Sequence, residues 1–275
     1  MPQRDPLGND GLVVRDSGDW VKEKLYYLER YLDIFSVGMK QKWRGHLYYV
    51  DLFAGPGKCR IRGTGEEIDG SPLIALKFNF AKYFFFESDA ASSHALTKRV
   101  KGTAPEKDVK IVHGNCNETI GEAGLPQSGL GLAFIDPTGV SPLAFGTIRR
   151  LAWGRKMDLI INFHEGMGIR MNIHQHARTS GGALDSFVGS ARWRERLKSA
   201  PASVDQICSE ITGEFQENLR GLDYNVVDRD HIPVKTDQNV LLYYLIFASK
   251  DERGNDFWRK VKVIDAYGQR KLPLA

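Results

Sequence analysis

The stretch YYVDLFAGPGKCR, residues 48–60, is an apolar, β-branched and aromatic run that breaks abruptly into glycine and proline. A chain changes in this way where a buried strand ends in a loop that must pass close to a ligand. The stretch therefore predicts a buried strand followed by a binding loop. Which ligand the loop holds depends on its spacing and on the rest of the chain.

Strand and helix patterns alternate on both sides of this loop, which favours an α/β fold with an open, mainly parallel sheet and helices on both faces. The apolar spacing of residues 19–43 predicts an amphipathic helix capped by Ser17 or Asp19. Ser-Pro pairs predict helix starts at Ser71 and Ser141. We expect seven strands, at residues 46–53, 82–88, 109–115, 130–137, 157–164, 224–236 and 239–251. The last two form an antiparallel pair that closes the end of the sheet, followed by a helix at 257–264.

The chain divides into a short leader and one domain. Residues 1–18 are predicted to be a loose, flexible leader, and residues 19–275 a single domain. Residues 166–220 interrupt the alternation with glycine pairs and basic helical stretches. We expect this segment to be a helical insertion that acts as a lid over the ligand edge of the sheet.

Composition excludes several classes of protein. No run approaches about 20 apolar residues, so a membrane span is not expected. The N-terminus lacks the apolar core of a signal peptide, and three scattered cysteines make neither a disulfide framework nor a CxxC site. We therefore expect a cytoplasmic protein. The net charge is only +4, but residues 149–198 hold ten Lys and Arg against four Asp and Glu. This region is either a solvated basic helix or a surface for RNA or DNA.

Three nucleotide motifs compete for the glycine loop. A P-loop needs a glycine at position 52, which is Leu, and a hydroxyl after Lys58, where Cys59 stands. The dinucleotide fingerprint needs a third glycine where Arg60 stands. S-adenosylmethionine has no pyrophosphate, so its site needs only a tight glycine loop and an acid for the methionine ammonium. The delayed helix start at Ser71 agrees with this third choice. Lys58 is then incidental.

S-adenosylmethionine is therefore the predicted cofactor, and its predicted contacts lie at the ends of three strands. The loop supplies Asp51, Phe53, Gly55 and Gly57. At the end of the next strand, Glu87 is expected to accept hydrogen bonds from the ribose hydroxyls, with Asp89 as the alternative. Asn115 or Asn117 would meet the adenine edge, although turn chemistry explains either asparagine equally well.

Several segments resemble the three-Cys-motif partner protein family over roughly residues 19–260. They are YYVDLFAGPG, GSPLIAL, FFFES, LAFIDPTG and LLYYLIFASKD. The resemblance implies a Rossmann-like class I S-adenosylmethionine-dependent methyltransferase fold. It also implies a possible partner, because the family is named for proteins found beside a separate three-Cys-motif protein.

Asp136-Pro137 stands where amino-methyltransferases that act on nucleic acid carry an acid-Pro-Pro-aromatic motif, but here Thr138-Gly139 follows. Asp136 is the predicted catalytic residue; the alternative is that it only caps the turn. Asn162 and His164, at the end of the next strand, are predicted to assist it. The predicted substrate contacts are Pro137, Thr138, Phe163 and Arg170, with Trp153 as another candidate for base stacking. No metal site is predicted, because His174 and His176 lack a clear third ligand.

The resulting hypothesis is a methyltransferase that acts on an amine or hydroxyl of nucleic acid. A small-molecule acceptor is the first alternative. The second is a non-catalytic protein, or one that depends on a three-Cys-motif partner, and the altered loop after Asp136 favours it.

Overall fold

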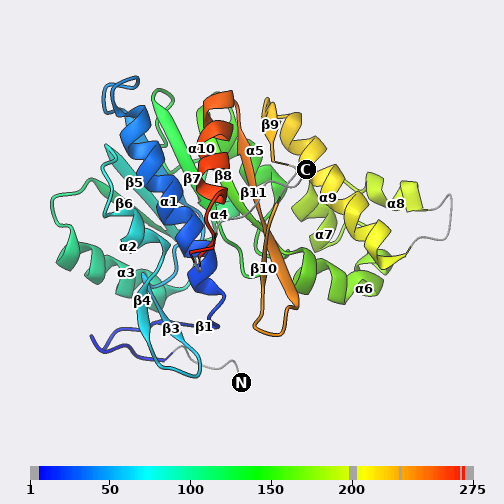
Figure 1. The fold of residues 1–275 in the computed structure, drawn as a ribbon, viewed down its shortest axis with the longest axis horizontal. Coiled ribbons are helices and arrows are strands. Elements are labelled where there is room, and N and C mark those ends of the chain that lie inside the picture. Colours follow the sequence, from blue (N-terminus) through cyan, green and yellow to red (C-terminus); the bar gives the residue numbers. More distant parts are fainter. Residues whose placement is uncertain (1–5, 198–202, 229–230, 267, 270–275) are drawn as a thin grey trace.

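The computed structural model describes residues 6–197, 203–228, 231–266 and 268–269. They form a large sheet between two layers of helices, with a small second sheet at the bottom of Figure 1. The large sheet has the order β10-β11-β8-β7-β2-β5-β6, and β9 pairs with β11. Its strands are β2 (Leu47–Asp51), β5 (Lys82–Glu87), β6 (Val109–His113), β7 (Leu130–Ile135), β8 (Lys156–Phe163), β9 (Val226–Val227), β10 (Ile232–Lys235) and β11 (Leu241–Ser249).

The strand order reverses at β2. From β2 the chain moves outward to β5 and β6, then returns to β7 on the other side of β2 and continues to β8, always in parallel. β11 runs antiparallel to both β8 and β10, and the antiparallel pair β10–β11 closes that end of the sheet, as predicted. Ligands of such sheets bind at the carboxyl ends of the strands, where the order reverses. The glycine loop that follows β2 lies at that point.

Two hydrophobic cores separate the sheet from its helices. Successive side chains of a strand point to opposite faces, so Tyr49 and Phe85 enter one core while Val50 and Phe84 enter the other. The first core lies under α1 (Val21–Lys40), α2 (Ser71–Ala75), α3 (Ala90–Thr103) and α10 (Glu252–Lys262). The second lies under α4 (Cys116–Thr119), α5 (Phe145–Ala152), α7 (Ala183–Val188) and α9 (Val204–Arg220).

The small sheet was not predicted. It consists of β1 (Arg15–Ser17), β3 (Lys58–Ile61) and β4 (Glu67–Asp69), with β3 in the middle. β1 belongs to the predicted leader and pairs in parallel with β3, which directly follows the glycine loop. The leader therefore contains a strand that is attached to the predicted binding loop.

Several predicted helix ends are wrong. The N-cap of α1 is Trp20, with no side-chain cap from Ser17 or Asp19. α2 starts at Ser71 as expected but ends after five residues. Ser141-Pro142 lies in a turn, and α5 begins only at Phe145. Proline fixes a backbone angle that suits the first turn of a helix and a β-turn equally, so the pair alone cannot separate them.

The predicted lid segment mainly covers a face of the sheet. It contains a π-helical turn (Glu165–Ile169), a 3₁₀ turn (Arg170–Asn172), α6 (Ile173–Arg178), α7, α8 (Arg192–Leu197) and α9. Apolar side chains of α7 and α9, such as Phe187 and Phe215, pack in the second core. In Figure 1, α6, α8 and α9 lie to the right of β9 and β11.

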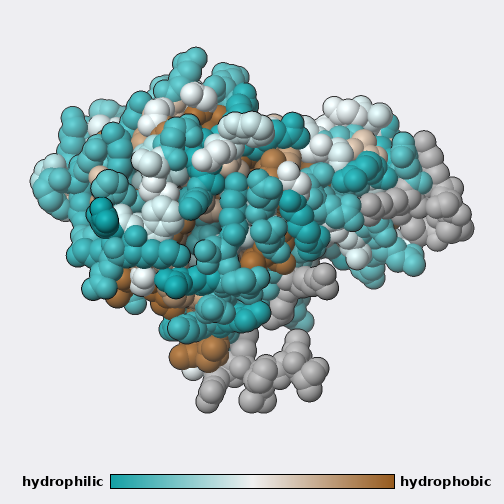
Figure 2. Space-filling model, turned by 90° about the horizontal axis from the view of Figure 1, so that it is seen from above, coloured by the Kyte–Doolittle hydropathy of each residue, from teal (hydrophilic) through white to brown (hydrophobic). Residues whose placement is uncertain are grey.

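The face of the molecule seen from above in Figure 2 is mostly polar. Figure 2 shows a largely hydrophilic face with separate small hydrophobic patches. Within the described ranges, we find no helix whose length and hydropathy would let it cross a bilayer.

Candidate functional site

A cavity of about 730 Å³ lies at the carboxyl edge of the large sheet, where the strand order reverses. Most of the residues predicted from strand ends line it together. They are Phe53, Gly55, Gly57, Glu87, Asp136, Pro137, Thr138, Asn162 and His164. These side chains come from four different strand ends, so the topology brings together what the sequence separates by more than one hundred positions.

The glycine loop needs both of its glycines. Gly55 and Gly57 have φ angles of +63° and +92°, which side chains rarely permit. A Cβ on Gly57 would press against Leu96 at 3.2 Å, whereas a Cβ on Gly55 would meet nothing within 4 Å. Gly57 is therefore required by packing. The backbone at Gly55 borders open space in the cavity, as expected where a loop approaches a ligand.

Glu87 stands at the junction of two cavities. Its oxygens accept hydrogen bonds from the backbone N–H groups of Gly55 at 2.8 Å and Asp89 at 2.7 Å. Its side chain lines the main cavity and also a smaller one of about 170 Å³. A carboxylate has about four acceptor positions, so two of them stay available for a ligand. The alternative, Asp89, uses its carboxylate to cap α3 through Ser92.

The smaller cavity lies over the end of β6. It is lined by Leu52, Phe53, Phe86, Glu87, Ser88, Gly114, Asn115, Cys116 and Pro142. The Asn115 side chain accepts a bond from the N–H of Asn117 and so caps α4. Asn117 binds the carbonyl of Pro142 and the N–H of Ala144, which makes it a structural residue. Asn115 alone of the two lines the cavity.

Asp51 lies beneath the loop rather than in the cavity. It is fully buried, and burial raises the pKa of its carboxyl to about 7. Its oxygens accept hydrogen bonds from the Phe53 N–H at 3.1 Å and the Tyr49 hydroxyl at 3.4 Å. Asp51 therefore holds the start of the loop, and its predicted direct contact with a ligand ammonium finds no support.

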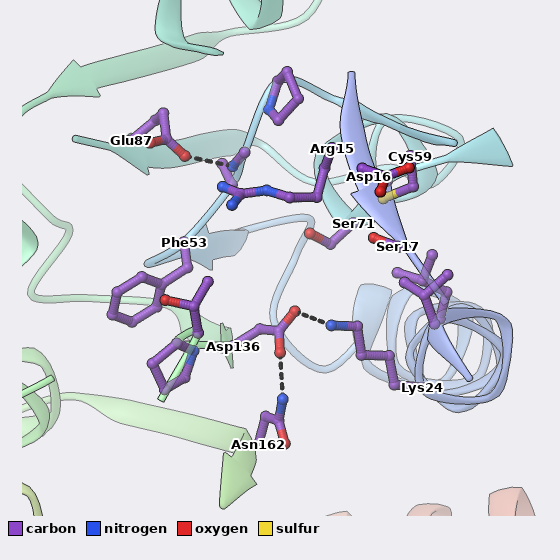
Figure 3. A pocket seen from close by; sticks show the side chains of 18 of the residues that line it. Arg15, Asp16, Ser17, Lys24, Phe53, Cys59, Ser71, Glu87, Asp136 and Asn162 are labelled. Atoms are coloured by element: carbon purple, nitrogen blue, oxygen red, sulfur yellow. Dashed lines mark hydrogen bonds and ion pairs between the residues drawn. The ribbon is translucent and has the colours of Figure 1, made fainter. Parts of the chain in front are cut away.

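The Asp136 carboxylate is held from two sides, as Figure 3 shows. Its Oδ2 lies 2.5 Å from the ammonium of Lys24, and its Oδ1 accepts from the Asn162 amide at 2.5 Å. Burial lowers the pKa of the Lys24 ammonium, but the negative charge of Asp136 more than offsets this, so that pKa lies above its usual value. The two side chains therefore form a largely enclosed ion pair.

His164 is anchored next to this pair. Its Nε2 lies 2.6 Å from the Pro137 carbonyl, which can only accept, so we assign the proton to Nε2. Burial lowers the pKa of the imidazole, which favours the neutral form with a free acceptor at Nδ1. The ring also lies 5.6 Å from that of Tyr243, another residue of the cavity wall.

Other predicted substrate residues lie elsewhere. Phe163 is fully buried against Phe187 and Phe215, because it points into the second core and not toward the carboxyl edge. Arg170 is paired with Glu165 and Asp205 and does not line the cavity. The structure therefore places neither residue in the cavity wall.

Trp153 and the histidine pair do not join the site either. Trp153 follows α5 just before β8 begins, which places it at the opposite edge of the sheet. His174 and His176 lie on α6, where residues two apart point in different directions. No cluster of three potential metal ligands occurs in the described ranges.

The structure adds cavity residues that the sequence did not suggest. Lys24 comes from α1, Arg15 from β1, Ser71 from α2 and Tyr243 from β11. Lys58, judged incidental, also lines the wall. From the predicted lid, only Met167 among the described residues reaches the cavity. Sequence patterns could not indicate Arg15 or Lys24, because neither lies at the carboxyl end of a strand of the large sheet or in a glycine motif.

The basic region 149–198 is not one continuous free surface. Arg155 donates to the carbonyls of Pro126 and Leu151, and Arg194 binds Asp185. Arg150 donates to the carbonyl of Asn117. Several of these arginines therefore make contacts within the protein that stabilise the fold.

Comparisons with known proteins give the fold but not the family. No protein family model matches the chain, and no curated protein sequence matches it. The resemblance to three-Cys-motif partner proteins is therefore not confirmed. Protein LPL1258 from Legionella pneumophila has a similar structure, with a TM-score of 0.54 and 9% identity, over 91% of this chain and 95% of that one. This likeness supports the mixed α/β fold with a large, mostly parallel sheet.

Two weaker likenesses involve methyltransferases. The putative methyltransferase yhhF from Escherichia coli has a TM-score of 0.40 and 16% identity, over 91% of each chain. Trm1 from Pyrococcus horikoshii, solved with S-adenosyl-L-methionine, has a TM-score of 0.45 and 10% identity, over 85% of this chain and 57% of that one. Scores this low assign no function to the present chain.

Proposed function

We propose that the two joined cavities bind S-adenosylmethionine and that the protein is a methyltransferase. The observation that carries the proposal is the Glu87 carboxylate at their junction, held by the amides of Gly55 and Asp89 with acceptor positions to spare. A carboxylate in this position suits the two hydroxyls of a ribose. The base would then enter the smaller cavity beside Phe53 and Asn115, and the methionine part would follow the glycine loop.

The residues present fit such a ligand. Gly55 leaves open space where any side chain would intrude, and the smaller cavity has apolar walls from Leu52 and Phe86. When bound, S-adenosylmethionine supplies an electrophilic methyl group on a positively charged sulfur. The residues of the chain would then chiefly position the acceptor, because a direct displacement requires the attacking atom to lie in line behind the methyl group.

The acceptor would be positioned by the wall around Asp136. Its carboxylate, fixed by Lys24 and Asn162, can still accept a hydrogen bond from an amine or hydroxyl. His164 stands beside it as a neutral base that can take the proton lost from the acceptor. We propose nucleic acid as the acceptor class, on the basis of Asp136-Pro137 in the wall and of the basic region 149–198.

One observation favours a second candidate. Both oxygens of Asp136 already have partners inside the chain, Lys24 and Asn162, and the aromatic residue that would stack a base is missing after Pro137. A cofactor-binding protein that acts only with a partner is consistent with this arrangement. A three-Cys-motif protein is the partner that the sequence resemblance suggests.

Calorimetry with S-adenosylmethionine and S-adenosylhomocysteine tests the cofactor proposal. The wild-type protein should bind both, and Glu87→Gln should weaken binding at least tenfold, because an amide cannot accept from both backbone donors and a ribose. Glu122→Gln, at an exposed site outside both cavities, is the matched control and should change nothing. Failure of the wild-type protein to bind either compound would refute the proposal.

Transfer of a labelled methyl group to RNA, DNA or a small-molecule fraction then tests the acceptor class. Binding to oligonucleotides should weaken steeply with salt if the basic region contacts phosphates. A flat salt response together with labelling of small molecules would exclude nucleic acid. Cofactor binding without transfer, restored by adding a partner protein, would favour the second candidate.

A further inference from the structure

The wall of the main cavity carries four carboxylates and four Lys and Arg side chains, and not all of them have a direct partner in the chain. Each carboxylate is already engaged within the chain. Asp136 pairs with Lys24, Asp16 lies 3.8 Å from Arg62, Glu87 accepts from two backbone amides, and Asp89 caps α3. Two cations of the wall, Arg15 and Lys58, make no side-chain hydrogen bond or ion pair within the described ranges. Arg15 and Lys58 are therefore the wall's cations whose N–H donors are available to a ligand.

Of these two side chains, Arg15 has the larger number of hydrogen-bond donors. Its side chain is only half-buried, yet its guanidinium carries five N–H donors that cannot lose their charge. β1 places it next to Cys59, because Arg15 pairs with that residue in the parallel register with β3. Figure 3 shows the side chain extending from β1 into the cavity, toward the side on which Glu87 lies. An acceptor group of a ligand on this side of the cavity would meet these donors.

We propose that Arg15 binds the methionine carboxylate of the cofactor. The inference rests on the proposed function, since it assigns one group of S-adenosylmethionine to one residue. That molecule has a single anionic group, the carboxylate, and a guanidinium matches a carboxylate with two parallel hydrogen bonds. With the ribose at Glu87 and the base in the smaller cavity, the amino-acid part extends into the main cavity, where Arg15 stands.

The proposal gives the N-terminal segment a function. β1 comes from the predicted leader, and it forms a wall of the cavity by pairing with the strand that follows the glycine loop. Cofactor affinity would thus depend on residues that carry no recognisable nucleotide motif.

Two ligands that differ only in the amino-acid part separate this proposal from its alternatives. S-adenosylhomocysteine carries the carboxylate, whereas 5′-methylthioadenosine keeps the adenosine and lacks it. In calorimetry, Arg15→Gln should raise the Kd for S-adenosylhomocysteine about ten- to hundredfold, the usual effect of losing a charged hydrogen bond. The Kd for 5′-methylthioadenosine should stay within twofold of the wild-type value, and Arg15→Lys should restore part of the loss.

Arg253→Gln is the matched control, because Arg253 is exposed on α10 and lines neither cavity. It should leave both affinities within about twofold. Equal losses for both ligands in Arg15→Gln would indicate a structural role and overturn the proposal. So would an unchanged affinity for S-adenosylhomocysteine, or a ligand-selective loss in Lys58→Met instead. If the wild-type protein binds neither ligand, the proposed function itself fails, and the assignment of Arg15 fails with it.

Discussion

At the scale of single residues, the pair Lys24–Asp136 shapes the acceptor side of the cavity. Both side chains are largely enclosed, at 15% and 16% exposure, so their attraction is weakly screened. Removing one partner leaves the other charge poorly solvated, whereas removing both leaves none. The pair thus keeps the Asp136 side chain fixed in the cavity wall.

A double-mutant cycle tests this coupling. We expect Lys24→Met and Asp136→Asn each to lower the free energy of unfolding by about 1–3 kcal/mol, because each leaves an unpaired charge in the wall. The double variant should lose less than the sum of the two, by about 1 kcal/mol or more. Urea unfolding at pH 7 measures all four proteins. Additive losses would show that the two charges act independently.

At the scale of elements, Arg99 of α3 fastens the N-terminal segment to the glycine loop. Its guanidinium forms two 2.8 Å hydrogen bonds to the Asp10 carboxylate and donates to the carbonyls of Val13 and Pro56. The hydrogen bond from Arg99 lowers the pKa of Asp10 to about 2. One buried arginine therefore connects the segment that carries β1 with the loop that borders the cavity.

Asp10→Asn should loosen this segment. Without the paired carboxylate, trypsin should release the peptide that ends at Arg15 about threefold to fivefold faster at pH 7, since a pair of this exposure contributes up to about 1 kcal/mol. Mass spectrometry of the released peptide measures the rate, with Asn9→Ser as the control. In the wild-type protein the anchoring should be complete above pH 4 and lost as the pH falls through 2, because the folded pKa is depressed. Equal rates for Asp10→Asn and wild type would contradict this anchoring.

The elements also show what a sequence alone can predict. Apolar runs such as residues 46–53 and 157–164 identified the central strands, and strand ends identified Glu87 and Asp136, because parallel strands finish at one edge. The hairpin of β3 and β4 was not predicted. Its strands, KCRI and EID, do alternate between polar and apolar residues, but runs of four and three residues are too short to be told from loop by periodicity. The place of Lys24 in the cavity wall was not predicted, because the helix around it was predicted from the spacing of its apolar residues alone. Its contact with Asp136 spans 112 positions and exists only in the folded chain.

At the scale of the whole molecule, buried carboxyl groups stand at both edges of the sheet. Asp51 ends β2 beneath the glycine loop, and Asp158 lies near the start of β8 at the opposite edge. Asp158 accepts hydrogen bonds from the hydroxyls of Tyr31 at 2.7 Å and Ser249 at 2.6 Å. These bonds join α1, β8 and β11, so one carboxyl group links a helix layer to two neighbouring strands.

This arrangement predicts a pH-dependent stability. Burial raises the pKa of Asp158 from its usual 3.8 to about 6, so the folded protein holds its proton where the unfolded chain has released it. The stability that this group contributes is fully present below pH 4 and is lost as the pH rises through 6. In the variant Asp158→Asn, the side chain at this position is an amide and cannot ionise. Relative to that variant, the wild-type protein should therefore lose about 2 kcal/mol of unfolding free energy between pH 4 and pH 7.

Urea unfolding of both proteins across this pH range measures the difference, and the contribution of Asp51 cancels because both proteins retain it. Asp256→Asn, at an exposed position of α10, is the control and should run parallel to the wild type. If the curves of wild type and Asp158→Asn also run parallel, Asp158 titrates alike in the folded and unfolded states. The hydroxyl groups of Tyr31 and Ser249 would then hold a carboxylate at every pH of the range.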